Sequence, residues 1–300
     1  MLNKQLKGVM QPSTVFEWDP RDFDSLRKSC DTDPATEHIL KYMPRDGAIL
    51  EAGCGLARFV QYLSDQGFES VLGLEINGDA LRAVKAMASE LELIHGDVSQ
   101  LCLRDDCIAG VISLGVVEHF IEGPEKPLRE MLRVLKPGGY GVITVPCMNS
   151  IRKVRYAFHI HKPTYRMRKA SSKILTTESS EPPDARRDCG SDVCNYRFKP
   201  WLRSGDFFEY RFTKREFEQE LKKAGFALVY SVPVGFWEGI YMDLLPVFEY
   251  LKKKRGFFMT VLCKLLERSL SFGIAIISGF SPFKGSYMHN HMLLCVVRKV

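Results

Sequence analysis

Short apolar runs alternate with amphipathic stretches through the first half of the chain. The apolar runs are 48–50, 70–74, 91–94, 110–114 and 140–145, and the helical patterns between them are 57–63, 79–89 and 125–135. Strands that alternate with helices favour a parallel sheet with helices on both faces. The pattern therefore predicts an α/β fold.

The alternation stops after Pro146 and resumes near Tyr210. Residues 210–226 show a helical pattern. Within it, Thr213 and Glu216 have the spacing of a capping box, which marks the start of the helix. Apolar runs follow at 227–232 and 292–297, and they supply a sixth and a seventh strand. Two long segments interrupt the pattern, one after the fifth strand and one between the last two strands.

The junction of the first strand and the helix that follows it contains the residues that suggest a binding site. Its sequence, ILEAGCGLARF, places Glu51 at the strand end and then Gly53 and Gly55 before the helix. Glycines allow backbone angles closed to other residues, and a helix start offers unpaired N–H groups. This junction predicts a binding site for a nucleotide-like ligand.

Two details narrow the choice of ligand. A dinucleotide fingerprint requires a third glycine where this chain has Arg58, so the pyrophosphate interpretation weakens. The carboxylate of Glu51 beside the glycine turn suits a ligand with a cationic end. At this point the sequence resembles the class I S-adenosylmethionine-dependent methyltransferases, whose first motif is commonly Asp/Glu-x-Gly-x-Gly-x-Gly, with Ala57 here at the last glycine.

The resemblance extends through the following strands. The second apolar run ends in Glu75, 24 residues after Glu51, and the third leads into His95, Gly96 and Asp97. The fourth ends in VVEH, and a helix, KPGG and a fifth strand follow. The resemblance implies a seven-stranded doubly wound sheet of order 3-2-1-4-5-7-6 with the last strand antiparallel and helices on both faces. It covers about two thirds of the chain.

The resemblance also implies S-adenosylmethionine as cofactor, S-adenosylhomocysteine as product, and a set of site residues. Glu51, Gly53 and Gly55 would hold the methionine end, Glu75 the ribose, and Asp97 with Val98 the adenine. Ser113, Leu114 and Gly115 would line the floor near the reacting sulfur. The full expected set for the cofactor is Glu51, Gly53, Cys54, Gly55, Glu75, Ile76, Asp97, Val98, Ser113 and Leu114.

His119 is the expected catalytic candidate. Its unperturbed pKa lies close to neutrality, so it could act as a general base. The alternative is that alignment alone drives the in-line displacement, without a protein base. Related ubiquinone-pathway and small-RNA methyltransferases carry E-x-x-E-H here and hold a divalent metal. Gly115 replaces the first Glu of that pattern, so no metal is expected.

Positive charge is concentrated after the fifth strand. Residues 151–215 hold 16 lysines and arginines against 7 aspartates and glutamates, in a chain of formal net charge +6. Aromatic residues interleave with this charge, which suits nucleic acid, anionic lipid headgroups or a phosphorylated small molecule. An ordinary insertion with a solvated basic face remains the alternative. Within it, His159, His161, Cys189 and Cys194 have poor spacing for structural zinc.

The segment between the last two strands, 234–288, is predicted to form a helical addition, with helices over 241–253 and 257–270. Its apolar stretch 269–283 has 15 residues without charge and contains two glycines, so it is too short for a membrane span. An acceptor pocket, a peripheral membrane face, added core or a dimer surface all fit it. The oligomeric state cannot be derived from these patterns.

The N-terminal part offers two interpretations and no targeting signal. The amphipathic run 35–43 either lies over the cofactor as part of a lid, as in the resembled family, or packs against the sheet edge. The first thirty residues lack an apolar core of a secretory signal, and the nine cysteines are scattered. A cytoplasmic protein with reduced thiols is expected, with peripheral contact at a membrane surface left open.

These expectations divide the chain into four parts. They are an N-terminal extension 1–32, a cofactor-binding core 33–147, a basic, partly flexible insertion 148–209, and the end of the core 210–300 with its helical addition. The predicted function is methyl transfer to an oxygen or nitrogen of a small-molecule or lipid- or glycan-linked acceptor. An RNA methyltransferase that uses the basic insertion and a non-catalytic scaffold that binds S-adenosylmethionine are the alternatives.

Overall fold

The computed structural model describes residues 18–150, 152–153, 197–203, 206–235 and 291–300. Its helices are η1 Pro20–Asp22, α1 Phe23–Ser29, α2 Thr36–Tyr42, α3 Arg58–Asp65, α4 Gly78–Met87, η2 Val117–His119, α5 Glu125–Val134 and α8 Lys214–Ala224. Its strands are β1 Ala48–Ala52, β2 Ser70–Glu75, β3 Glu92–His95, β4 Ile108–Leu114, β5 Leu135–Pro146, β6 Lys199–Arg203, β7 Asp206–Arg211, β8 Ala227–Val234 and β9 Met292–Arg298.

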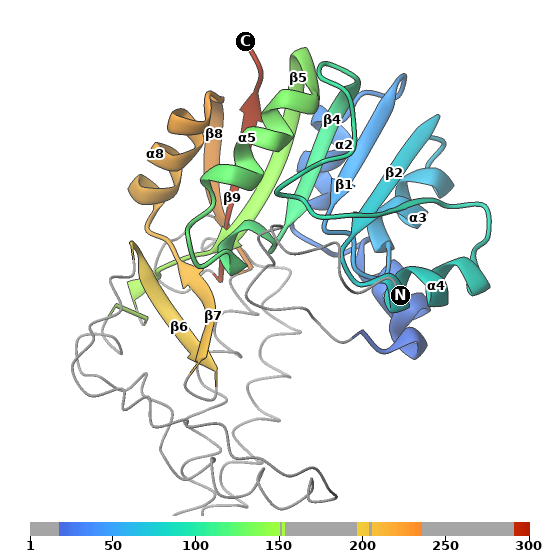
Figure 1. Ribbon diagram of the computed structural model, residues 1–300, viewed down its shortest axis with the longest axis horizontal. Coiled ribbons are helices and arrows are strands. Elements are labelled where there is room, and N and C mark those ends of the chain that lie inside the picture. The colour runs from blue at the N-terminus through green and yellow to red at the C-terminus, as the bar shows by residue number, and fades with distance from the viewer. Residues whose placement is uncertain (1–17, 151, 154–196, 204–205, 236–290) are drawn as a thin grey trace, which may run out of the picture.

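Seven strands form one sheet in the order β3-β2-β1-β4-β5-β9-β8 (Figure 1). The first five are parallel, and β9 runs antiparallel to both of its neighbours, β5 and β8. This order confirms the predicted 3-2-1-4-5-7-6 topology, because β8 and β9 are the sixth and seventh predicted strands. The order reverses between β1 and β4, and a crevice forms at such a switch point, outside the carboxyl ends of the strands.

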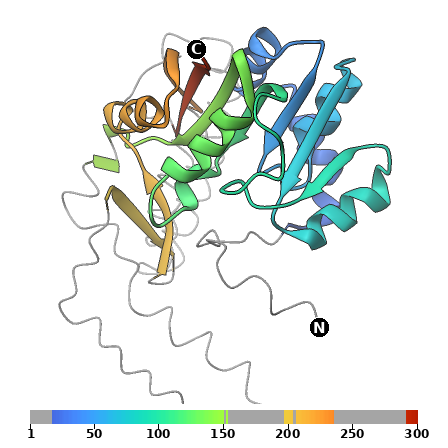
Figure 2. The same ribbon diagram turned by 45° about the horizontal axis from the view of Figure 1, so that its top comes forward.

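Two hydrophobic layers cover the sheet, one on each face. Helices α5 and α8 contribute Leu128, Met131, Phe217 and Leu221 to one layer, and Figure 2 shows these two helices together on one side. Helices α1 to α4 contribute to the other layer, through residues such as Ile39, Phe59, Val60 and Val84. Helices on both faces of a parallel sheet explain why its strands read as continuous apolar runs.

The start of helix α8 confirms the capping box predicted from Thr213 and Glu216. The Thr213 hydroxyl accepts from the Glu216 N–H, and the Glu216 carboxylate accepts from the Thr213 N–H, so the capping box is complete. The C-cap is Gly225, whose φ of +106° lies in the left-handed region that favours glycine.

The structure corrects the boundary after α5. The KPGG sequence was expected as a turn that precedes a strand beginning at Tyr140, whereas β5 begins at Leu135. Leu135 pairs with Ile108 and Tyr140 pairs with Gly110, so the four intervening residues bulge out of the ladder. A Cβ on Gly139 would lie 2.9 Å from the carbonyl oxygen of Ala109, which explains why glycine is needed there.

A two-stranded antiparallel sheet, formed by β6 and β7, was not predicted. It lies at the end of the segment expected to be a basic insertion, and it projects from the main sheet below α8 in Figure 2. The Phe212 N–H donates to Pro146 O, so the chain after β7 is tied to the end of β5. Strand β7 also packs against η2, which brings it to the carboxyl edge of the sheet.

Several expectations lie outside the described residues. They are the helices 241–253 and 257–270, the apolar stretch 269–283, and the four His and Cys residues weighed as a zinc site. Within the described part of the chain, no helix is both long enough and apolar enough to cross a membrane.

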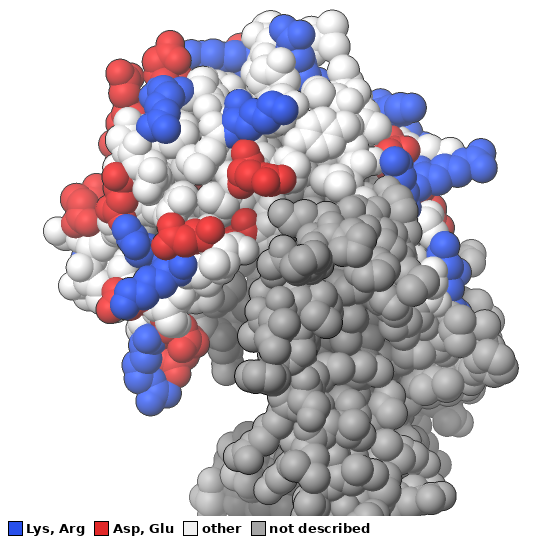
Figure 3. Space-filling model, turned by 180° about the vertical axis from the view of Figure 1, so that it is seen from behind, with Lys and Arg blue, Asp and Glu red and all other residues white. Residues whose placement is uncertain are grey.

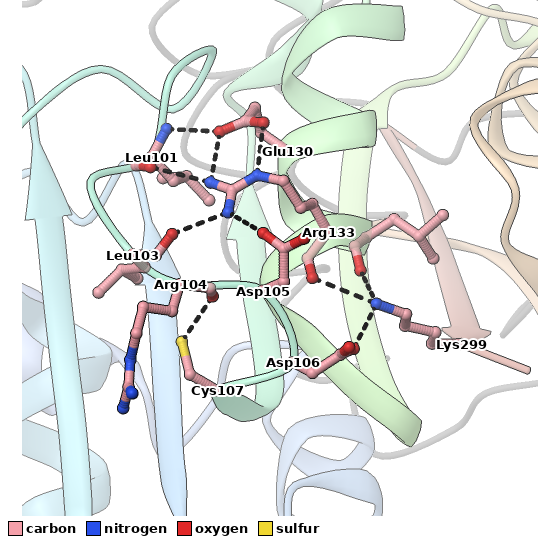
Figure 4. Close-up of polar contacts among 10 residues, drawn as sticks. Leu101, Leu103, Arg104, Asp105, Asp106, Cys107, Glu130, Arg133 and Lys299 are labelled. Atoms are coloured by element: carbon pink, nitrogen blue, oxygen red, sulfur yellow. Dashed lines mark hydrogen bonds and ion pairs between the residues drawn. The ribbon is translucent and has the colours of Figure 1, made fainter.

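A polar network anchors the loop between β3 and β4 to helix α5 (Figure 4). The guanidinium of Arg133 donates to both carboxylate oxygens of Glu130, to Asp105, and to the carbonyl oxygens of Leu101 and Leu103. It thereby lowers the pKa of Glu130 below its usual value. The carbonyl oxygens of Leu101 and Leu103 lie in a loop outside the strands, so the Arg133 guanidinium supplies the donors that a neighbouring strand would otherwise give.

Replacing Arg133 by methionine should lower the free energy of unfolding by about 2 kcal/mol, because several charge-assisted hydrogen bonds are lost together. Urea unfolding followed by circular dichroism measures this change. The matched control is Arg129→Met on the same helix, whose exposed ion pair with Glu125 should contribute less than about 0.5 kcal/mol. Equal effects of the two substitutions would contradict a special role for the network.

Candidate functional site

A cavity of about 420 Å³ lies at the carboxyl ends of four neighbouring strands, β3, β2, β1 and β4. Glu51 ends the apolar part of β1, Glu75 ends β2, Asp97 follows β3, and Leu114 ends β4. The lining residues are Trp18, Leu26, Glu51, Gly53, Cys54, Leu56, Arg58, Glu75, Ile76, Gly96, Asp97, Val98, Leu114, Gly115, Val116, His119 and Phe120. Three acidic residues, Glu51, Glu75 and Asp97, thus line a mainly apolar cavity, and they come from three adjacent strand ends.

The glycine turn after β1 forms one wall of the cavity. Gly53 and Cys54 donate their N–H groups to the carbonyl oxygen of Leu74, which fixes the turn against β2. Gly53 has φ of +82°, and a Cβ there would lie 2.5 Å from a methyl group of Val116. Only glycine allows both the backbone angle and the close approach at this position.

Glu51 connects the turn to helix α3. Its carboxylate accepts a hydrogen bond of 3.1 Å from the N–H of Val60 in the first turn of that helix. The residue is buried, and burial raises the pKa of Glu51 to about 8, against the lowering effect of the Arg58 guanidinium. Without a ligand, this carboxyl therefore binds a proton near neutral pH.

The pKa of Glu51 predicts a pH dependence of stability. Because burial raises the pKa in the folded state, the stabilisation is fully present below the unfolded-state pKa near 4.5 and is lost as pH rises to about 8. Over that window the wild type should lose up to about 1.4 kcal/mol per pH unit relative to Glu51→Gln. Urea unfolding of both proteins from pH 5 to 9 measures the difference. Parallel pH profiles would contradict the buried, protonated carboxyl.

Glu75 holds the second strand end to the glycine turn. One carboxylate oxygen accepts from the N–H of Gly55 at 2.9 Å, and the other accepts from the N–H of Asn77 at 2.9 Å. The residue is 8% exposed and lines the cavity. Each oxygen has a second lone pair, so Glu75 can accept two further hydrogen bonds from adjacent hydroxyl groups of a ligand.

Asp97 presents an acceptor that no described residue satisfies. Its Oδ1 accepts from the N–H of Ser99 at 2.7 Å, whereas its Oδ2 is buried without a hydrogen-bond partner in the described structure. A buried polar atom without a partner costs free energy, which a ligand donor at this place would recover. The neighbouring His95 makes a local hydrogen bond instead, because its Nε2 lies 2.9 Å from the carbonyl oxygen of Ile76.

The structure brings most of the sequence-predicted cofactor residues together. Eight of the ten line the cavity, namely Glu51, Gly53, Cys54, Glu75, Ile76, Asp97, Val98 and Leu114. Gly55 does not line it but lies under the Trp18 indole, where a Cβ would be 2.5 Å from a ring carbon. Ser113 is buried in β4 and is absent from the lining, because its neighbour Leu114 faces the cavity instead.

Sequence reasoning missed the N-terminal side of the cavity. Trp18 and Leu26, from the segment around η1 and α1, contribute to the lining, whereas no residue of α2 does. Helix α2 packs on β5 instead, with the Tyr42 and Tyr140 rings 5.3 Å apart. Of the two alternatives for 35–43, packing on the sheet applies. Helix α2 reaches from β5 to the edge strand β8, where the Tyr42 and Tyr230 rings lie 5.8 Å apart and His38 hydrogen-bonds the Tyr230 hydroxyl.

His119 lies in η2 at the end of the cavity near Leu114. Its Nδ1 is 2.7 Å from the carbonyl oxygen of Phe208 in β7, and the two rings meet edge to face. A carbonyl only accepts, so Nδ1 carries the proton and Nε2 of the neutral ring holds the lone pair. Burial lowers the pKa of His119 below its usual value, which keeps the ring neutral at pH 7.

Glu118, beside His119, is the second buried titratable group of η2. Its pKa lies well above the usual range, mainly because of burial and secondarily because of Glu209. Its Oε1 is 3.9 Å from Nε2 of His119, so a neutral carboxyl lies near a neutral imidazole. No group of three or more His, Cys, Asp or Glu side chains suited to a metal ion occurs among the described residues.

A second cavity of about 300 Å³ adjoins the first. Arg58, Leu114 and Gly115 line both cavities, so the two meet at the end of β4. The second cavity continues along Asp33, Thr144, His291 and Met292, from the loop before α2 and the ends of β5 and β9. A molecule in the second cavity would therefore lie beyond the end of a ligand that spans the first.

Residues 50–143 match the family model described as a methyltransferase domain. This range spans all of the strand ends that form the first cavity. The chain contains a class I methyltransferase domain. That family implies S-adenosylmethionine as its cofactor.

Comparison with known proteins supports the same family. The chain is 30% identical over 98 residues to a probable S-adenosylmethionine-dependent methyltransferase of Mycolicibacterium smegmatis, which is 33% of this chain and 37% of that protein. It is 27% identical over 114 residues to the tRNA (carboxymethyluridine(34)-5-O)-methyltransferase of Arabidopsis thaliana, 37% of this chain and 27% of that protein. The chain thus spans well under half the length of these relatives.

A solved structure shows the same fold over most of the chain. An S-adenosylmethionine-dependent methyltransferase from Methanosarcina mazei superposes with a TM-score of 0.52 at 17% identity, and the match covers 88% of this chain and 97% of that one. At this identity the likeness concerns the fold alone.

The residues of the methyltransferase domain fit the implied cofactor. The unpartnered Oδ2 of Asp97 matches an amino group that donates, as on adenine. The pair of open acceptor positions on Glu75 matches the two hydroxyls of a ribose. The acidic Glu51 beside the glycine turn matches the ammonium of a methionine. The strand order β3-β2-β1 places Asp97, Glu75 and Glu51 in the order of adenine, ribose and methionine in the cofactor.

Proposed function

We propose that this chain transfers the methyl group of S-adenosylmethionine to an oxygen or nitrogen nucleophile. The observation that carries the proposal is the row of Glu51, Glu75 and Asp97 at three neighbouring strand ends, in one cavity beside a glycine turn. The bound cofactor would supply a sulfonium whose methyl group is electrophilic. The protein then has to bind the cofactor and the acceptor, align them, and remove a proton from the acceptor.

Each of the predicted site residues has a role in that proposal. Asp97 and Val98 hold the adenine, Glu75 the ribose hydroxyls, and Glu51 with Gly53 and Gly55 the methionine end, with Cys54, Ile76 and Leu114 as the apolar lining. His119 stands at the Leu114 end of the cavity as the general base, with its proton-bearing nitrogen held by the Phe208 carbonyl. Ser113 acts indirectly, through the packing of β4.

The second cavity supports a small acceptor, or one end of a larger one such as a lipid- or glycan-linked molecule. It begins at Leu114 and Gly115, where the methyl group would be delivered, and its volume of about 300 Å³ suits a small molecule. We propose a cytoplasmic location for the enzyme, with peripheral membrane contact as an option for a lipid-linked acceptor. The described cysteines support a reducing compartment, because all six are free thiols.

An RNA acceptor is the second candidate. The relative from Arabidopsis thaliana is named for tRNA, and residues 151–215 of this chain are rich in Lys and Arg. On the face seen in Figure 3, however, the described basic residues are interspersed with acidic ones. An RNA substrate requires a basic surface that tracks the phosphates, so methylation that falls steeply with added salt would favour this candidate.

Calorimetric titration with S-adenosylhomocysteine tests the cofactor part of the proposal. One-site binding that Asp97→Ala weakens at least about tenfold is expected, because a charge-assisted hydrogen bond is lost. Transfer of a labelled methyl group from S-adenosylmethionine to small-molecule extracts or to tRNA then separates the two acceptor classes. Binding without transfer to any acceptor would support the non-catalytic scaffold, and absence of binding would overturn the proposal.

A further inference from the structure

The turn that carries His119 is short and has little internal support. Helix η2 spans Val117–His119, and its C-cap, Phe120, already has an extended backbone. The N–H of His119 donates to the carbonyl oxygen of Val116 at 3.2 Å. Because a single 3-10 turn has poor hydrogen-bond geometry, its orientation depends on the elements that pack against it.

Strand β7 holds this turn at two points. The carbonyl oxygen of Phe208 lies 2.7 Å from Nδ1 of His119. Two residues further along both segments, the hydroxyl of Tyr210 donates to the carbonyl oxygen of Ile121 at 2.5 Å. A shift of the turn relative to β7 would therefore disturb both contacts together.

The Tyr210 ring is itself fixed by packing. The residue is 1% exposed, and its ring centroid lies 4.7 to 6.1 Å from those of three phenylalanines, Phe198, Phe207 and Phe212. A buried tyrosine hydroxyl needs a hydrogen-bond partner, and the carbonyl of Ile121 is one. Loss of the hydroxyl alone leaves the ring in this cluster, so its contribution can be separated from that of packing.

The Phe208 carbonyl determines which nitrogen of His119 carries the proton. A neutral imidazole has one N–H, and a carbonyl oxygen only accepts, so this contact favours the Nδ1–H tautomer. Without the contact the proton can reside on Nε2 instead. In that form Nε2 has no lone pair with which to take a proton from the methyl acceptor. The position of η2 against β7 thus sets the fraction of His119 that can act as a base.

We propose that Tyr210 is a positioning residue for His119: by holding the Ile121 carbonyl, its hydroxyl keeps the His119 ring against the Phe208 carbonyl in the Nδ1–H tautomer. The proposal rests on the proposed function, in which His119 is the base. It gives the β6–β7 sheet a consequence for catalysis, because β7 supplies both contacts. Tyr210 itself is not among the residues that line the two described cavities, so it acts through the turn.

A purely structural role for Tyr210 makes a different prediction. In that case its hydroxyl contributes only to stability, and its loss lowers the melting temperature without any change at His119. Tyr230 offers a matched control, because its hydroxyl oxygen lies 2.5 Å from Nδ1 of His38 in the hydrophobic layer on the opposite face of the sheet. Tyr230→Phe removes a comparable hydrogen bond and leaves η2 and β7 intact.

The test compares the full-length wild type, Tyr210→Phe and Tyr230→Phe by nuclear magnetic resonance of protein with nitrogen-labelled histidine, at about pH 8, where the ring is neutral. The nitrogen chemical shifts of a neutral imidazole report its tautomer, and the His119 signals are assigned by their absence from His119→Asn. The wild type should show mainly the Nδ1–H form. Tyr210→Phe should shift the ratio of the two forms about fivefold toward Nε2–H, the equivalent of one hydrogen bond, and Tyr230→Phe should leave it unchanged.

A tautomer shift confined to Tyr210→Phe supports the proposal. An unchanged ratio in Tyr210→Phe, or equal shifts in both variants, would overturn it in favour of the structural role. A wild type that is mainly in the Nε2–H form also overturns it, and this measurement needs no variant to fold. The spectra are recorded without ligand, so they are independent of the proposed function, which fails if the wild type does not bind S-adenosylhomocysteine in calorimetry.

Discussion

Replacing Glu75 by alanine should lower the affinity for S-adenosylhomocysteine by at least about 100-fold, the largest loss expected of any single strand-end residue. Two effects combine in this substitution. The ribose would lose both of its hydrogen bonds to a carboxylate, and the turn would lose the bond from Gly55 that the same carboxylate accepts. Because the Asn77 bond is lost as well, the loop after β2 also becomes less ordered. Calorimetric titration measures the affinity.

Two controls make this result specific to the site. Glu75→Gln keeps the shape and one acceptor oxygen, so its loss should be smaller than that of the alanine variant. Glu92→Ala removes an exposed glutamate at the amino end of β3, whereas the cavity lies at the carboxyl ends of the strands. This variant should bind like the wild type. If Glu75→Ala bound within about threefold of the wild type, the assignment of the ribose to this strand end would be wrong.

The strand-end residues could be predicted because they follow from local sequence. An acid after an apolar run, followed by a glycine turn and a helix, defines Glu51 and the turn without long-range information. The spacing to Glu75 and Asp97 follows from the alternation of strand and helix, whereas the order of the sheet was implied by the resemblance to the methyltransferase family. The cavity contains eight of the ten predicted cofactor residues for this reason.

The unpredicted parts depend on contacts between segments far apart in the sequence. Trp18 and Leu26 reach the cavity because α1 packs on α3, and nothing in the local pattern around them indicates this. The β6–β7 sheet meets His119 through Phe208, a partner 89 residues away. Ser113 does not line the cavity for a simpler reason. Successive residues of a strand face opposite sides, so only one of Ser113 and Leu114 can face the cavity.

Replacing His119 by asparagine should lower the rate of methyl transfer by about 100- to 10,000-fold while leaving the affinity for S-adenosylhomocysteine nearly unchanged. The asparagine amide can still donate to the Phe208 carbonyl, so the contact between η2 and β7 is preserved and only the basic nitrogen is lost. Steady-state rates with the identified acceptor measure kcat, and calorimetry measures cofactor affinity. His119→Ala removes both the base and the contact, and its additional loss of thermal stability would report the structural contribution.

The pH profile separates a base from a residue that only aligns the acceptor. The base acts when neutral, and burial lowers the pKa of His119, so wild-type kcat/KM should be constant through neutral pH and fall only at a pH below the usual pKa of histidine. His119→Asn should lack this acidic limb. If the variant kept both the wild-type rate and the limb, the proton would leave by another route, and the in-line displacement would depend on alignment in the two cavities alone.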